Sequence, residues 1–155
     1  MLLKELPEHI SPEKICRAAP SQGTVMQGKI MLSKMSNLTE ELRAQKLAFA
    51  TVSLTFAVDK AGICSITGEM TVDLTLICQR CLQPMMQTIT AVISVSPVSS
   101  DEQAKHLPAR YEPLLVQNGE ITFAEWIAEE LHLALPLVPR HDPPCVSYGK
   151  NQELT

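Results

Sequence analysis

The chain has 155 residues, of which 45% are hydrophobic and only 4% are aromatic. This length and composition fit one folded domain with an aliphatic core, and they exclude an intrinsically disordered chain. The formal net charge of -4 and the pI near 5.5 do not favour nucleic-acid binding on charge alone.

The N-terminal segment, residues 1–45, predicts an extended arm followed by a short helix. Ser11 fits the N-cap position and Pro12 the first position of that helix, which ends before Pro20. Residues 37–45 are polar and predict a further turn of helix on the surface.

Five stretches of the chain predict β-strands because their residues alternate in polarity or are rich in apolar side chains. They cover residues 23–32, 47–58, 63–68, 70–78 and 85–95. The third stretch can run on into the fourth, and Asp59–Gly62 forms a tight turn before it. Short connections between neighbouring strands predict an antiparallel meander, either as one curved sheet or as a small, partly closed barrel.

Two capping boxes predict helices in the C-terminal part. Ser100 with Gln103 begins a short helix, and Thr122 with Glu125 begins a longer one. The longer helix carries apolar residues at helical spacing and ends at Pro136, so we expect one of its faces to pack on the sheet.

These elements together predict an α+β fold. We expect residues 1–145 to form a single domain whose N-terminal arm, residues 1–45, is poorly determined by the sequence. The proline-rich segment that follows the last helix has little to bury, and we expect residues 146–155 to be a mobile tail.

No apolar run approaches the roughly 18 residues of a transmembrane helix. The first residues carry charged side chains and do not resemble a secretory signal peptide, so we expect a cytoplasmic protein. The five cysteines are odd in number and unevenly spaced, which argues against a disulfide framework. We expect Cys16 and Cys64 to be buried as small apolar residues.

Cys78 and Cys81 form a Cys-x-x-Cys motif on the turn between two predicted strands. A structural zinc ion would need two more ligands, for which Cys145 and His141 are the first candidates. The reserves for these two positions are Cys64, Cys16 and His9. No second Cys-x-x-Cys motif is present, so a redox pair and a purely structural hairpin remain as alternatives to zinc. Pro84 argues against the redox pair, because it disfavours the helix that activates a redox thiol.

Other candidate contact residues carry charge. Arg80 and Arg140 are candidates for contacting phosphate or a carboxylate, whereas Glu125 and Glu129 suit an acidic docking face for a partner. The ordinary alternative for each is a solvated surface residue. The sequence contains no phosphate-binding glycine loop and no nucleophile-elbow motif, so we expect no enzyme and no small-molecule substrate.

A family resemblance rests on a series of short blocks in one order. They are Leu74–Cys81, Ser96–Val98, Ser100–Ala104, Leu107–Pro108, Tyr111–Pro113, Gly119–Ile121, Glu129–Glu130, Leu133–Pro139, His141–Asp142 and Cys145. In these blocks the chain resembles the bacterial large ribosomal RNA subunit accumulation proteins, the YceD-like family, which also has plastid relatives in plants. Residues 1–45 take no part in the resemblance.

The resemblance implies a non-catalytic role in the synthesis, processing or stability of 23S ribosomal RNA during large-subunit biogenesis. Two mechanisms follow as hypotheses. In one, the protein binds precursor RNA or an assembling particle. In the other, it is an adaptor that meets another protein, such as a large-subunit assembly protein, through its acidic helix face. The family's suspected metal binding implies at most one Zn²⁺ as cofactor, and no membrane partner is implied.

Overall fold

The computed structural model describes residues 2–3, 6–20, 22–45, 48–136 and 139. Its centre is a six-stranded sheet in the order β1-β3-β4-β5-β6-β7. The strands are β1 (Leu2–Leu3), β3 (Thr24–Met31), β4 (Phe49–Val58), β5 (Cys64–Ile77), β6 (Pro84–Val98) and β7 (Glu112–Leu115). The four central strands run antiparallel, while β1 and β7 join the two edges in parallel. The predicted α+β meander is therefore confirmed.

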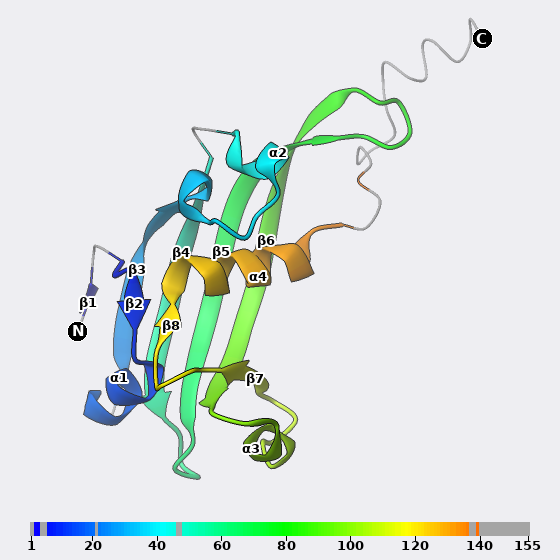
Figure 1. Ribbon diagram of the computed structural model, residues 1–155. Helices are drawn as coiled ribbons and strands as arrows, with labels where there is room; N and C mark the ends of the chain where they lie inside the picture. The colour runs from blue at the N-terminus through cyan, green and yellow to red at the C-terminus, as the bar shows by residue number, and fades with distance from the viewer. Residues whose placement is uncertain (1, 4–5, 21, 46–47, 137–138, 140–155) are drawn as a thin grey trace, which may run out of the picture.

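The remaining elements surround this sheet. A two-stranded sheet pairs β2 (His9–Ile10) with β8 (Ile121–Thr122). The helices are α1 (Pro12–Ala18), the 3₁₀ turn η1 (Leu32–Lys34), α2 (Glu40–Arg43), α3 (Asp101–Lys105) and α4 (Phe123–Ala134). Figure 1 shows α4 crossing one face of the sheet, with α1 near one end of the strands and α2 towards the other.

The sheet is open rather than closed. Its order begins at β1 and ends at β7, and the described residues pair no strand of one edge with the other. The alternative of a partly closed barrel is therefore wrong. The two predicted strands at residues 63–68 and 70–78 are one continuous strand, β5, which ends at Ile77. It pairs with β4 from Cys64 to Val72 and with β6 from Ile66 to Ile77.

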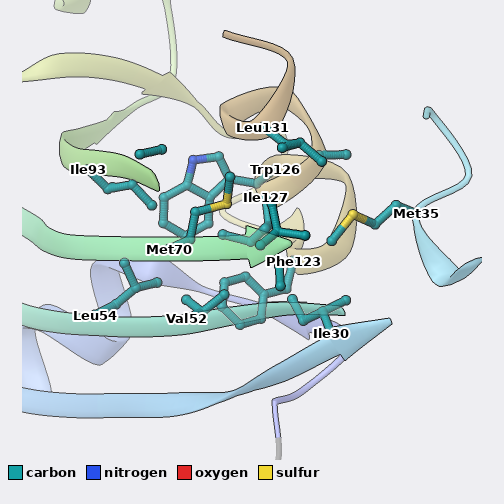
Figure 2. Packing of buried hydrophobic residues seen from close by; sticks show 14 of the residues in the cluster. Ile30, Met35, Val52, Leu54, Met70, Ile93, Phe123, Trp126, Ile127 and Leu131 are labelled. Atoms are coloured by element: carbon teal, nitrogen blue, oxygen red, sulfur yellow. The ribbon is translucent and has the colours of Figure 1, made fainter. Parts of the chain in front are cut away.

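The alternation in the sequence decides which face of the sheet is buried. Met70, Val72 and Leu74 of β5 lie against the core, and Thr71 and Asp73 point to the opposite face. Figure 2 shows side chains of the sheet and of α4 pointing toward one another. The pictured residues include Ile30, Val52, Leu54, Met70, Ile93, Phe123, Trp126, Ile127 and Leu131. The predicted packing of the long helix on the sheet is thus confirmed.

The helix termini follow the predicted signals in position, but two of the predicted N-caps make no side-chain capping bond. Ser11 occupies the N-cap position of α1 without such a bond. Ser100 caps α3 by accepting a hydrogen bond from the Gln103 amide at 3.1 Å, as a capping box requires. Thr122 occupies the N-cap position of α4 but makes no side-chain capping bond. Since Thr122 already pairs with β2 through β8, the first amide of the helix, at Phe123, is satisfied by the carbonyl oxygen of Glu8 at 2.9 Å.

The structure also corrects the expectation that the cysteines form no disulfide. Cys16 and Cys64 are buried as predicted, but the structure joins them in a disulfide that ties α1 to the start of β5. Their Cα atoms lie 5.7 Å apart, within the range that a disulfide spans. The argument from cysteine count and spacing missed this bond because only the fold brings two residues 48 positions apart together.

Within the described part of the chain, no helix is both long enough and apolar enough to cross a membrane. The proposed boundary between a domain at residues 1–145 and a tail at 146–155 falls outside the described residues.

Candidate functional site

The Cys-x-x-Cys motif lies on a hairpin that projects from the sheet. The last pair between β4 and β5 joins Ala50 to Val72, whereas β5 and β6 remain paired as far as Ile77 and Pro84. The hairpin therefore extends beyond the neighbouring strand, which Figure 1 shows as the green ribbon at the upper right. This arrangement confirms the predicted placement of the motif on a turn between two strands.

Backbone hydrogen bonds fix the shape of the turn. The Cys78 amide donates to the carbonyl oxygen of Gln83 at 3.0 Å, and the Leu82 amide donates to the carbonyl oxygen of Cys78 at 2.8 Å. Leu82 adopts φ +61°, a left-handed conformation that is uncommon outside glycine and asparagine. Such strain persists where the surrounding structure fixes it, and it concentrates at functional sites.

The two sulfur atoms differ in exposure. Cys78 is fully buried and packs with Met85 in a small cluster that also contacts Leu76 and Cys81. Cys81 is only half-buried. The Arg80 amide donates a hydrogen bond to Cys78 Sγ at 3.4 Å. The turn thus presents one sulfur that is held by the backbone and one that is accessible.

The other proposed zinc ligands are not placed. His141, Cys145 and the candidate contact Arg140 lie outside the described residues. Within the ranges that are described, no group of three or more His, Cys, Asp or Glu side chains is arranged to hold a metal. The Gln79 amide does donate to the carbonyl oxygen of Pro139 at 2.7 Å, so Pro139 lies against the hairpin.

The three reserve ligands are excluded by their positions. Cys64 begins β5 and Cys78 follows its end, which separates them by about 45 Å of extended strand. Cys16 is joined to Cys64, and His9 pairs with Thr122 in the small sheet.

A groove beside α4 is lined by the acidic candidate residues. It has a volume of ≈ 1110 Å³ and lies between α4, β7, β8 and the C-terminal half of β6. Glu125 and Glu129, which the sequence suggested, both line it and are exposed. The fold adds three further carboxylates to the lining, Glu112, Glu120 and Glu130. The sequence pattern shows that this part of the chain is acidic, but only the fold brings Glu112 and Glu120, which belong to other elements, beside the carboxylates of α4.

Glu130 is the partly buried member of this group. Trp126 Nε1 donates to its carboxylate at 3.3 Å. Burial raises the pKa of Glu130, and the neighbouring charges of Glu129 and Glu112 raise it further, while the bond from Trp126 lowers it. The groove is therefore a place where negative charge is crowded and a cation would be favoured.

A polar cluster at the opposite end of β5 was not predicted. Asp59 accepts hydrogen bonds from the Tyr111 hydroxyl at 2.6 Å and from Arg110 at 3.0 Å, and also from the amides of Ala61 and Ile63. The Tyr111 bond, followed by the Ile63 amide, holds the pKa of Asp59 well below its ordinary value. The cluster joins the β4–β5 turn to the segment before β7, so its role is structural.

Comparisons with known proteins identify relatives for most of the chain. The family model described as large ribosomal RNA subunit accumulation protein YceD matches residues 66–153. The protein named large ribosomal RNA subunit accumulation protein YceD from Haemophilus influenzae is 37% identical over 115 residues. That alignment covers 74% of this chain and 66% of the Haemophilus protein, so it spans just under two thirds of the relative. No solved structure matches the chain.

Proposed function

The chain belongs to the large ribosomal RNA subunit accumulation protein YceD family, and from this premise we propose that it supports accumulation of 23S ribosomal RNA as a non-catalytic factor. The observation that carries the proposal is the extent of the family match. Residues 66–153 include the cysteine hairpin, the groove and α4. The proposed place of action is the cytoplasm, where large ribosomal subunits assemble.

The first proposed mechanism is direct binding of precursor RNA or of an assembling particle. The hairpin is the proposed contact because it projects from the sheet and carries the exposed side chain of Arg80 near its tip. A guanidinium group binds phosphate through a planar fork of donors, and an exposed position costs it little desolvation.

We propose further that the hairpin holds one zinc ion, with Cys78, Cys81, Cys145 and His141 as ligands. Two observations support this ligand set. An amide already points at Cys78 Sγ, and Pro139 lies against Gln79. Two residues of chain span at most about 7 Å, so His141 is within reach of the hairpin. Zinc would supply structural cross-linking of the hairpin to the segment after α4.

The test of RNA binding uses cells that lack the gene and produce tagged protein from a plasmid. We expect the protein to recover 23S precursor RNA or large-subunit proteins, and its loss to lower 23S relative to 16S RNA. Arg80→Ala should weaken binding to a 23S precursor fragment by about fivefold, whereas Arg43→Ala, an exposed arginine on α2, should have little effect. Recovery of neither RNA nor subunit proteins would refute the proposal.

The second candidate function is an adaptor that binds another protein through its acidic helix face. The specific observation that favours it is the groove, because its lining in the described part of the chain includes five glutamates and no lysine or arginine. A phosphate backbone would be repelled there. Reversal of Glu125 and Glu129 to Lys should abolish partner capture while leaving the fold intact. Unchanged capture would exclude this face.

A further inference from the structure

The edge of β6 is only partly covered. On one side β6 pairs with β5 from Pro84 to Val95. On the other side it pairs with β7 only from Val95 to Val98. Among the residues that the structure describes, no strand pairs with the outer edge of β6 from Pro84 to Ser94. An uncovered strand edge of this length offers unpaired amide and carbonyl groups to another chain.

The uncovered edge opens into the acidic groove. Ala91, Val92 and Val95 of β6 are among its lining residues. Figure 1 shows α4 crossing the sheet in front of β6 and ending beyond it, so the helix lies beside the edge. A strand added to β6 would therefore lie against α4 along part of its length.

The groove also presents apolar side chains to solvent. Val92 on β6 is 82% exposed, Leu133 on α4 is 83% exposed and Leu115 on β7 is 53% exposed. Apolar residues at these exposures on three elements around one groove are typical of a binding surface. They would gain the free energy of burial when a partner covers them.

The charge of the groove selects the partner. Among the residues that the structure describes, its lining contains Glu112, Glu120, Glu125, Glu129 and Glu130 and no basic residue. The raised pKa of Glu130 reflects the crowding of these carboxylates as well as burial. A segment with lysine or arginine side chains would relieve that repulsion, whereas a nucleic acid or an acidic protein would increase it.

We propose that the outer edge of β6 binds an extended, lysine- or arginine-rich segment of a partner protein as an additional strand. The segment's backbone would pair with β6 between Thr88 and Ser94. Its basic side chains would point to the α4 face and meet the carboxylates there, and the alternate apolar side chains would cover Val92 on the opposite face of the sheet. This inference rests on the adaptor function proposed above and specifies both the binding mode and the chemistry of the partner.

The test uses the full chain and a fluorescent peptide of about eight residues that alternates lysine with valine, which spans roughly 26 Å as a strand. We expect Glu125→Lys with Glu129→Lys to weaken binding at least about tenfold. The matched control is Glu40→Lys with Glu41→Lys, the same charge change on two exposed residues of α2, which should shift affinity less than about twofold. Circular dichroism would verify that both variants are folded.

Hydrogen exchange separates strand addition from simple attraction of charges. With peptide bound, we expect every second amide between Thr88 and Ser94 to gain protection, because alternate amides of a strand point to its outer edge. A version of the peptide that is N-methylated at alternate residues should lose binding. Absence of protection in β6, or equal binding by the methylated peptide, would overturn the proposal.

Three further outcomes would also overturn it. Protection of β6 that rises with protein concentration, without peptide, would show that a second copy of the chain occupies the edge. Competition by single-stranded RNA for the same residues would assign the groove to nucleic acid. Failure of the peptide to bind, while 23S precursor still copurifies with the protein, would refute the strand-addition mode and leave the role in ribosomal RNA accumulation standing.

Discussion

At the scale of single residues, Gly68 shows how closely the strands of this sheet approach one another. Gly68 lies within β5 opposite Leu54 and has φ +154°. A Cβ atom added there would collide with the carbonyl oxygen of Ser53 and with the Leu54 Cα. Both obstacles are backbone, which cannot move aside as a flexible side chain can.

We therefore expect Gly68→Ala to lower the free energy of unfolding by roughly 2–4 kcal/mol, because the added methyl group strains the β4–β5 pairing. Urea unfolding measures this change. Gly62→Ala is the matched control, since a Cβ at that glycine meets nothing within 4 Å and carries only the cost of its positive φ. A loss at Gly68 no larger than that at Gly62 would contradict the clash.

Asp59 gives a second prediction at this scale, concerning pH. Its pKa is lowered in the folded protein by the Tyr111 hydroxyl and the Ile63 amide, so the ionised carboxylate stabilises the fold. That contribution is present above the pKa of the unfolded state, about 4, and is lost as the pH falls below it. Asp59→Asn should therefore be less stable than the wild type at pH 7, and the difference should shrink at pH 3. A difference that is independent of pH would show that the ionised carboxylate contributes nothing.

At the scale of elements, the hairpin between β5 and β6 is the segment whose chemistry is most open to measurement. The turn is held by its own backbone hydrogen bonds and by the contact of Gln79 with Pro139. It contributes only a small cluster to the core, around Cys78 and Met85. Its sequence is therefore not explained by packing alone.

For this element we predict about one zinc ion per chain in untagged protein purified without chelator. Cys78→Ser with Cys81→Ser should abolish zinc binding, as elemental analysis would show. Cys16→Ser with Cys64→Ser, at the far end of β5, should retain it. Absence of metal from the wild type would leave the hairpin as a scaffold and assign its contacts to Arg80 alone.

At the scale of the whole molecule, the Cys16–Cys64 disulfide joins the N-terminal helix to the central sheet. α1 packs against β4 and β5 near the end of the sheet where α3 also lies, as Figure 1 shows. The disulfide thus fixes a segment that belongs to residues 1–45, the part of the chain for which no family resemblance was found.

We expect the disulfide to stabilise the oxidised protein by about 4 kcal/mol, the loop-closure value for a separation of 48 residues. Urea unfolding with and without reductant measures this difference. In a reducing cytoplasm the bond would be open, so the oxidised and reduced forms can both be tested for function. Equal stability of the two forms, or rapid alkylation of both thiols in native protein under oxidising conditions, would contradict the bond.

The sequence by itself determined the long central strands, the main helices and the family, but not the short strands β1, β2, β7 and β8. Strand alternation predicted which residues of β4, β5 and β6 face the core, since side chains of a strand point alternately to its two faces. Proline and capping signals placed α1, α3 and α4 correctly, because local backbone chemistry sets helix ends. The hairpin position of Cys78 and Cys81 followed from the same local rules.

Only the tertiary structure decided what long-range contacts create. It showed that the sheet is open, that Cys16 meets Cys64, and that Glu112 and Glu120 join the carboxylates of α4 in one groove. It also showed that most of the outer edge of β6 pairs with no strand of the described chain. The physical reason is the same in each case. Alternation and capping depend on neighbours in the chain, whereas disulfide pairing, charge crowding and edge exposure depend on residues that are distant in sequence and adjacent only after folding.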